Sequence, residues 1–242
     1  MPIGIFANAL ALLVGSIFGY TFRKYIPTQI ITKLTILIGY ISIALGIILT
    51  IKTATLAVLI FSLLLGFLLG DTLQIESKIH LLLRTIKPKF DRIFPQNSAP
   101  PEQSEQLISL IVLFCFGSTG IIGALTEGFT GNPNLMLAKS VLEIFTATIF
   151  SASLGIIVGA IAIPQFIFFM ILYSLANFLM PFVSTPIVLN DFIGCGGVIL
   201  LITGFRILEI KQFPILNLTP ALIIVIPLSI FWNTYIFPLL TN

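Results

Sequence analysis

Residues 3–21, IGIFANALALLVGSIFGYT, form an uninterrupted stretch without a single charged side chain. A helix of about 20 apolar residues is long enough to cross the hydrocarbon core of a bilayer, so this stretch predicts a membrane-spanning helix. Its first charges, Arg23 and Lys24, come after the apolar stretch, whereas a secretory signal peptide carries its charges before it. We therefore expect the segment to be retained as a membrane helix.

The composition extends this interpretation to the rest of the chain. Of 242 residues, 57% are hydrophobic and 9% are charged, against about 25% charged residues in ordinary soluble domains. Twelve basic and nine acidic residues are too few to cover the surface of a soluble protein of this size. Backbone polar groups in lipid must pair within the protein, and the apolar stretches are continuous rather than alternating. The sequence thus predicts an all-α, polytopic transmembrane helix bundle in contact with lipid.

Apolar stretches of membrane-spanning length recur along the chain. We expect eight spans, approximately over residues 3–21, 34–51, 54–70, 107–126, 139–163, 165–183, 192–210 and 215–237. The third and the seventh stretches are near the short limit, so six or seven spans are the alternatives.

The basic residues indicate how the bundle is oriented. With the N-terminus outside, the inner side receives ten of the twelve: Arg23, Lys24, Lys33, Lys78, Arg84, Lys87, Lys89, Arg92, Arg206 and Lys211. Only Lys52 and Lys139 fall on the outer side. Because cytoplasmic loops carry an excess of Lys and Arg, eight spans with both termini outside is the favoured topology. The same asymmetry accounts for the net charge of +3 without a nucleic-acid partner.

One polar segment divides the chain into three parts. Residues 1–71 hold the first three spans, residues 72–106 form a cytoplasmic segment, and residues 107–242 hold the last five spans. The beginning of the cytoplasmic segment has apolar residues at helical spacing among basic ones, which predicts a short amphipathic helix on the inner membrane face, ended by Pro88. Its second half, PQNSAPPEQSEQ (95–106), is typical of a flexible linker.

Motifs of enzymes and metal sites are missing from the sequence. There is no phosphate-binding glycine loop, no nucleophile elbow and no Cys/His metal spacing. The sole histidine, His80, falls on the amphipathic segment, and Cys115 and Cys195 lie in apolar stretches where buried thiols are common. We expect no enzyme activity, no cofactor and no bound metal. An intramembrane enzyme is the remaining alternative, and Glu127 and Glu143 are the only pair of carboxylates that the sequence offers for it.

The candidate functional residues are polar groups at membrane depth, which are costly and often functional. Glu127 and Glu143 flank an expected outer loop over residues 128–138, and each ends a face of small residues on its helix. Lys139 precedes Glu143 by one helical turn and can pair with it, and Ser140 lies on the same face. These faces either line a path for a solute or are helix-packing seams with an interfacial salt bridge.

Two further polar sites occur near the ends of the chain. Asn8 lies within the first apolar stretch, and Asn217 and Thr219 precede Pro220 in the last one. Because Pro220 removes a backbone donor, it can break the final helix and expose carbonyl groups to a solute or ion. The alternative is that these side chains form hydrogen bonds between helices.

Glycine spacing raises two questions about larger-scale organisation. Gly15–Gly19, Gly66–Gly70 and Gly155–Gly159 are GxxxG pairs, which allow a homodimer. LIGYISIALGIILTIK (37–52) and FIGCGGVILLITGFRILEI (192–210) share a glycine spacing and run in opposite directions in the expected topology. Such an arrangement is typical of the inverted repeats of transporters.

Four segments resemble the bacterial integral-membrane family known as domain of unknown function 554, the YdfK/YqgA-like proteins. They are FANALALLVGSIFG (6–19), LLLGFLLGDTLQIE (63–76), LFCFGSTGIIGALTEGFTGNPNLMLAKSVLE (113–143) and IGCGGVILLITGFRILEIKQFPILNLTPAL (193–222). The resemblance implies a membrane protein presumed to be a transporter, with no agreed substrate.

Acidic positions of the family pattern are only partly kept in this chain. The family has Asp-Gly where this chain has Glu127–Gly128, and Lys-Ser-x-x-Asp-Gly where it has Lys139, Ser140, Glu143 and Ile144. The family's Gly-Asp is Gly131–Asn132 here, so one acid is lost, which argues against tight cation ligation by three acids.

The hypothesis from the sequence is a transporter or channel for a small solute or ion in the bacterial plasma membrane. Glu127 and Glu143 would carry protons or cations between the fourth and fifth spans, while Lys139 and Ser140 would shape the outer mouth. The alternative is a non-transporting scaffold or sensor that uses the basic segment 72–92 as its docking surface.

Overall fold

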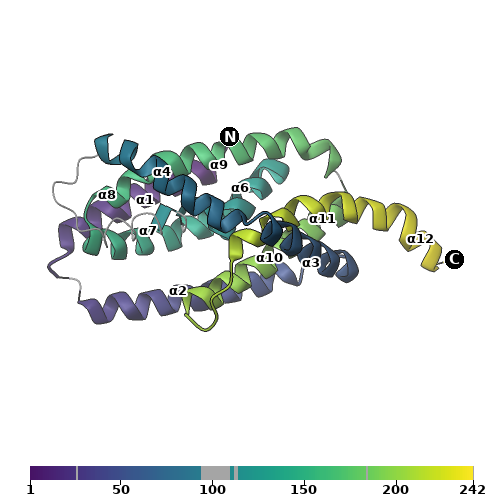
Figure 1. Cartoon of the computed structure of the whole chain (residues 1–242), viewed down its shortest axis with the longest axis horizontal. Coiled ribbons are helices and arrows are strands. Elements are labelled where there is room, and N and C mark those ends of the chain that lie inside the picture. The colour runs from purple at the N-terminus through teal and green to yellow at the C-terminus, as the bar shows by residue number, and fades with distance from the viewer. Residues whose placement is uncertain (26, 94–109, 112–113, 184, 242) are drawn as a thin grey trace. The chain divides into compact units, whose positions relative to one another are not determined.

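The computed structural model describes residues 1–25, 27–93, 110–111, 114–183 and 185–241 (Figure 1). These residues form helices and no strands, which confirms the all-α class. They divide into two compact units, residues 1–37 with 77–177 and residues 38–76 with 178–242. The expected linker over residues 95–106 lies outside the described residues.

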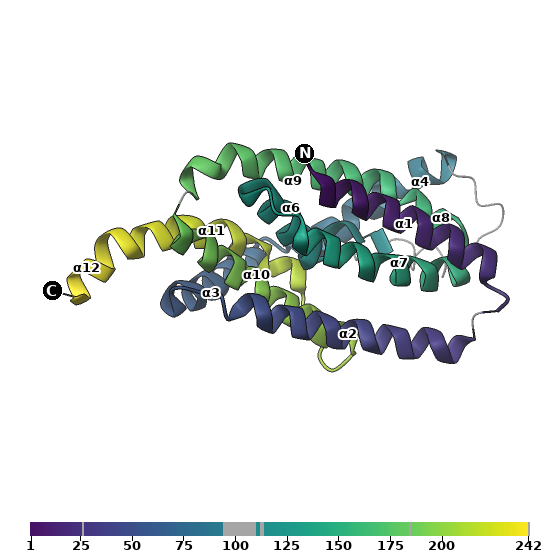
Figure 2. The same ribbon diagram turned by 180° about the vertical axis from the view of Figure 1, so that it is seen from behind.

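In the first unit, α1 (Ile3–Phe22) runs alongside α7 (Asn134–Leu154) in the same direction (Figure 2). A methyl group placed on Gly4 would lie 2.6 Å from Cβ of Met136, and one on Gly19 would lie 2.8 Å from Cα of Thr148. The two helices therefore touch through their backbones, which only small residues allow. The opposite side of α1 exposes Leu10, Val14 and Ile17, as a lipid-facing surface does.

The α7 helix ends earlier than its sequence predicts. Gly155 adopts a positive φ of 88° and donates its backbone N–H to the carbonyl of Ser151, which closes the helix. The chain then continues through the short α8 (Ile157–Ala160) into α9 (Ala162–Leu179). The expected spans 139–163 and 165–183 were thus wrong at their shared boundary. As a consequence, Glu143 lies near the midpoint of α7 rather than near its outer end.

The rest of the first unit includes α6 (Ser118–Thr130) and most of α4 (Ile75–Ile93). Gly131, with a φ of 70°, ends α6 and begins the turn into α7, so the outer loop is far shorter than the expected residues 128–138. The α4 helix continues past Pro88 to Ile93, so Pro88 does not end it as expected.

In the second unit, helices pack in opposite directions. The later part of α2 (Thr28–Thr50) meets α10 (Pro186–Ile207), because a methyl group on Gly46 would lie 2.6 Å from the backbone nitrogen of Leu201 and one on Gly197 would lie 2.5 Å from that of Thr50. The two segments with shared glycine spacing, 37–52 and 192–210, are therefore packed antiparallel. Whether they are an inverted repeat stays a prediction.

The remaining helices of the second unit are α3 (Leu56–Thr72), α11 (Thr219–Phe231) and α12 (Phe237–Thr241). Pro220 lies in the first turn of α11, directly after a 3₁₀ turn, where its missing N–H is not needed. The prediction that Pro220 breaks the last helix was wrong, and the proline inside α11 is Pro227. A π-helical turn, Trp232–Ile236, connects α11 to α12.

Six described helical segments are long and apolar enough to cross a membrane: Ile3–Phe22, Gln29–Thr50, Asn134–Leu154, Ile157–Leu179, Pro186–Ile207 and Ile215–Leu239. A seventh is added if Leu56–Thr72 and Ile75–Leu82 form one bent span. The fourth expected span, 107–126, lies partly outside the described residues. Because α1 and α7 are parallel, an odd number of crossings must separate them. The eight expected spans place three there, whereas the seven described segments place two. The eight-span count and the external termini stay predictions.

Candidate functional site

Five buried polar side chains gather in the first unit from four different helices. They are Asn8 of α1, Glu127 of α6, Lys139 and Glu143 of α7, and Gln165 of α9. Each is at most 6% exposed. On α1, Asn8 shares a face with Gly4 and Gly15, and the small size of these glycines lets α7 approach closely enough for its side chains to reach the asparagine.

Lys139 and Glu143 form an ion pair along one turn of α7, as the sequence predicted. The Lys139 ammonium also donates to Oδ1 of Asn8 over 3.1 Å and lies 5.2 Å from the centre of the Phe169 ring. Since α7 rises about 1.5 Å per residue, Glu143 is about 13 Å from the start of its helix, roughly half the thickness of a hydrocarbon core. The pair therefore lies in the first half and the middle of a helix that is long and apolar enough to cross a membrane.

Gln165 connects this pair to α9 and to the segment before α6. Its Nε2 donates to Oε1 of Glu143 and, over 2.9 Å, to the carbonyl oxygen of Phe114. Its Oε1 accepts from Nδ2 of Asn8 over 3.1 Å. Each side chain of the group Asn8, Lys139, Glu143 and Gln165 is thus bonded to at least two others, and we call these four residues the polar network. Both carboxylate oxygens of Glu143 have a donor.

Glu127, on α6, lies beside the first turn of α1, one turn before Asn8. Its Oε1 accepts from the backbone N–H of Gly4 over 2.8 Å, so the carboxyl group caps the first turn of α1, where free N–H groups and the helix dipole favour an acceptor. Its Oε2 is buried and has no hydrogen-bond partner. A methyl group on Gly4 would lie 2.6 Å from that oxygen, so only glycine fits at this position.

Polar contacts continue along the α1–α7 seam beyond the network. The Thr148 hydroxyl donates to the carbonyl of Gly15 over 3.1 Å, and the Ser151 hydroxyl donates to the carbonyl of Ser16 over 2.6 Å. The hydroxyl of Ser16 is itself buried without a partner. A column of polar groups therefore follows α1 from Gly4 to Ser16.

The structure brings together four of the seven residues singled out in the sequence: Asn8, Glu127, Lys139 and Glu143. Ser140 is buried beside them, but its hydroxyl donates to the carbonyl of Met136 in its own helix, so it does not take part in the network.

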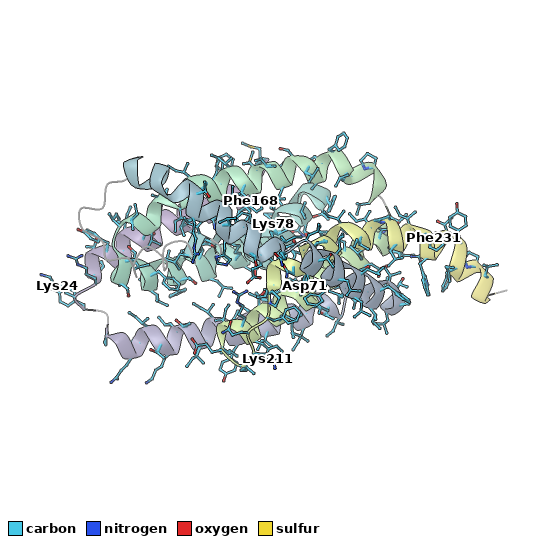
Figure 3. The ribbon with its side chains drawn as sticks, viewed as in Figure 1. Lys24, Asp71, Lys78, Phe168, Lys211 and Phe231 are labelled. Atoms are coloured by element: carbon cyan, nitrogen blue, oxygen red, sulfur yellow. The ribbon has the colours of Figure 1, made fainter. Side chains whose placement is uncertain are left out.

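Asn217 and Thr219 belong to the second unit. Asn217 donates to Oδ1 of Asp71 over 3.1 Å and accepts from the backbone N–H of Glu76 over 2.9 Å, and Figure 3 shows Asp71 at the end of α3. Thr219 donates to the carbonyl of Leu216. Asn217 thus bonds to groups of α3 and α4, as the alternative from the sequence describes, whereas Thr219 bonds only within its own segment. A role of either residue in binding a solute stays a prediction.

Two buried polar residues were missed by reasoning from the sequence. Gln165 was hidden inside an apolar stretch, although a lone amide at membrane depth is itself a signal. Asp191 falls just before an expected span, yet it is 0% exposed in α10. Its Oδ1 accepts from the backbone N–H groups of Ala54 and Thr55 over 3.0 and 2.7 Å, and its Oδ2 accepts from the Ser229 hydroxyl over 2.6 Å. Asp191 thus fixes the two residues that lead into α3.

The glycines of the three GxxxG pairs lie at helix contacts or helix ends within their own unit. Gly15 and Gly19 pack on α7, while Gly66 and Gly70 pack on Ala221 and Asn217. Gly155 ends α7, and Gly159 lies against Ser16. Apart from Gly155, these glycines already pack against residues of their own unit. A homodimer stays a prediction without a defined interface.

Among the described residues, no group of three or more His, Cys, Asp or Glu is placed to hold a metal ion. Cys115 and Cys195 are both buried free thiols. The polar network is closed on itself, with one cation, one carboxylate and two amides, each of which can give up a partner to an incoming ion or polar solute.

Comparison with known proteins identifies relatives over nearly the whole length. The chain is 38% identical over 238 residues to the uncharacterized protein YqgA of Escherichia coli (strain K12), covering 97% of this chain and 99% of that protein. It is 28% identical over 227 residues to the uncharacterized membrane protein YdfK of Bacillus subtilis (strain 168), covering 91% and 93%. No solved structure matches the chain. Residues 3–230 match the family described as "Protein of unknown function (DUF554)", so this membrane protein of packed apolar helices belongs to that family.

Proposed function

We propose that the protein is a transporter or channel that moves a small solute or ion across the bacterial plasma membrane. The observation that supports this most directly is the Lys139–Glu143 pair, buried at the midpoint of α7 and bonded to Asn8 of α1 and Gln165 of α9. Burying a charge pair in a membrane is expensive, and well-packed apolar residues would stabilise a bundle at least as well. A pair kept there is better explained by a substrate that must interact with it.

The network supplies a way for a bound ion or solute to change the packing of helices. Gln165 of α9 bonds to Glu143, and Asn8 of α1 bonds to Lys139 and Gln165. An ion or solute that bonds to Glu143 therefore competes with both Lys139 and Gln165. Loss of those bonds weakens the ties between α7 and its two neighbours. A solute that binds the loosened arrangement more tightly than the closed one shifts the equilibrium toward it.

The proposed setting is a multi-pass protein of the plasma membrane with both termini outside. Relatives in two bacteria, one of them described as a membrane protein, support the bacterial membrane setting. The excess of basic residues on one side of the expected topology supports the orientation. The proposal assigns the chain no catalytic step and no cofactor.

Purified protein in detergent is first screened for thermal stabilisation by a panel of monovalent and divalent cations, anions and small polar metabolites. Any compound that stabilises the protein is then followed as flux into vesicles that contain the purified chain. We expect flux in the wild type and its loss in Glu143→Gln, while Ser140→Ala, which lies beside the network without joining it, transports normally. Flux at the wild-type rate in a folded Glu143→Gln variant would contradict the proposal, as would a screen in which no compound on the panel crosses the membrane.

The alternative, a scaffold or sensor, is favoured by one observation on α4. This helix extends from Ile75 to Ile93, exposes Leu81 and Leu82, and carries five basic residues along its length: Lys78, Arg84, Lys87, Lys89 and Arg92. On this alternative, Arg84→Gln combined with Lys87→Gln impairs the cellular role more than Glu143→Gln does. The reverse order of effects supports transport.

A further inference from the structure

We infer that the ion which drives or accompanies transport is a proton, and that the closed structure holds it on Oε2 of Glu127. This inference rests on the proposed function for its biological meaning, but the location of the proton is a property of the folded chain alone. The starting observation is that Glu127 is 1% exposed and that its Oε2 has no hydrogen-bond partner, while its Oε1 has only the N–H of Gly4.

The charges around Glu127 do not balance if it is ionised. The titratable groups on the elements packed around it are Lys139 and Glu143 on α7, Cys115 before α6 and Tyr173 on α9, where the Tyr173 backbone approaches Gly128. The N-terminal amine of Met1, just before α1, belongs to an exposed residue, so Lys139 is the only buried cation among the described groups here, and it is already paired with Glu143. One lysine and two ionised glutamates leave one uncompensated negative charge in a buried site. A single added proton removes it.

The donors around the two carboxyl groups show which of them holds that proton. Glu143 has a donor on each oxygen, one of them an ammonium, and this surrounding stabilises its ionised form. Glu127 has one neutral backbone donor and no cation paired with it. We therefore assign the proton to Glu127, the carboxyl group that has one oxygen without a partner.

A metal cation fits this site less well than a proton does. Hard cations require several oxygen ligands at once. No group of three or more His, Cys, Asp or Glu in the described part of the chain could hold a metal ion. On one side, Oε2 lies against the backbone of Gly4, an apolar CH₂ group that offers no ligand. A proton needs only the one oxygen.

The neighbouring network gives this proton somewhere to go. Gly4 and Asn8 are one turn apart on α1, and the Lys139 side chain that bonds to Asn8 also lies against Gly120 on α6, two turns before Glu127 and on the same face. When the O–H bond of Glu127 breaks and an O–H bond forms on Glu143, the total charge of the three groups is unchanged. The ammonium of Lys139 then loses its ionised partner on α7 and is attracted toward the newly ionised Glu127 on α6. Proton transfer thus changes which helix Lys139 binds.

Infrared difference spectroscopy tests the location without any transport measurement. A protonated carboxylic acid has a carbonyl band that is separate from the amide bands and shifts in D₂O. We expect purified wild-type protein in lipid at neutral pH to show this band. Glu127→Gln, which keeps an acceptor for the N–H of Gly4, should lose it, whereas Asp191→Asn, in the second unit, should keep it. Glu127→Asp, which retains a carboxyl group, should shift the band rather than abolish it.

Absence of the band in the wild type, or its persistence in Glu127→Gln, would overturn the inference. Loss of the band in Asp191→Asn would assign the proton to the second unit and also overturn it. The result is separable from the proposed function. If solute flux is measured but the Glu127 band is absent, the protein is a transporter that does not hold its proton on Glu127. If the band is present but no flux is measured, Glu127 is a buried acid in a protein that does not transport.

Discussion

Replacing Lys139 by methionine should destabilise the first unit far more than replacing Lys139 and Glu143 together by neutral residues. In the described part of the chain, Lys139 is the only cation paired with Glu143, and it also bonds to Asn8. Lys139→Met leaves a carboxylate and an amide oxygen without their donor in a site that is at most 6% exposed.

The expected losses in the free energy of unfolding follow from the groups that each variant leaves without a partner. Removing one partner of a buried ion pair costs about 3–5 kcal/mol, because the other charge is left uncompensated. Glu143→Gln leaves the ammonium of Lys139 buried without a counter-charge and leaves one acceptor oxygen for the two donors of Lys139 and Gln165, so its cost falls in the same range. The double variant Lys139→Met/Glu143→Gln has no unpaired charge, and its remaining cost is that of unsatisfied amide groups, about 1–3 kcal/mol.

The free energy of unfolding can be measured by titrating SDS into mixed micelles and following helix content by circular dichroism. Ser140→Ala is the matched control on the same turn of α7, and it should change this free energy by no more than about 1 kcal/mol, because its hydroxyl bonds only to Met136 of its own helix. If the cost of the double variant equals the sum of the costs of the two single variants, the reasoning is refuted. Lys139 and Glu143 would then not be energetically coupled.

Three further predictions concern the second unit. Gly46→Ala would place its Cβ 2.6 Å from the backbone nitrogen of Leu201, so α2 and α10 must separate by about 0.8 Å to reach 3.4 Å, at a cost of about 1–3 kcal/mol in the same unfolding assay. A loss no larger than that of Gly159→Ala, where the nearest atom is a side-chain Cβ at 3.2 Å, would contradict this. Asp191→Ala should cost about 2 kcal/mol more than Asp191→Asn, because alanine leaves the N–H groups of Ala54 and Thr55 without an acceptor; equal losses would exclude this role of Asp191. Arg206→Gln should cost less than about 1 kcal/mol, and salt should reduce the loss, since the Arg206 side chain is 33% exposed in its pair with Glu76; an effect that salt does not change would argue for a buried role.

The class of the fold could be read from the sequence with little ambiguity, while the ends of its helices could not. Uncharged stretches such as residues 3–21 leave the backbone no option in lipid but to form helices. Boundaries were less certain because apolar residues continue on both sides of a break. The division between α7 and α9 at Gly155 depends on one residue with a positive φ, and hydropathy carries no signal for it.

The site was predicted in part for a related reason. A lysine and a glutamate four residues apart are neighbours on any helix, so the Lys139–Glu143 pair followed from spacing alone. Gln165 and Asp191 bond to residues more than 20 positions away, and no local pattern reveals those partners. The unpartnered oxygen of Glu127 is likewise a consequence of what surrounds it in three dimensions.

The sequence by itself determined that this chain is a bundle of membrane helices, because the cost of placing unpaired backbone and charged side chains in lipid depends on composition and on local order along the chain. It also determined that Lys139 and Glu143 are partners. Only the tertiary structure decided that the pair lies at the middle of α7, that Asn8 and Gln165 close a network around it, and that Glu127 is buried with one oxygen unpaired. Those features depend on which helices touch and in which direction they run. Small residues allow such contacts at many places, and the packing of the whole unit selects among them.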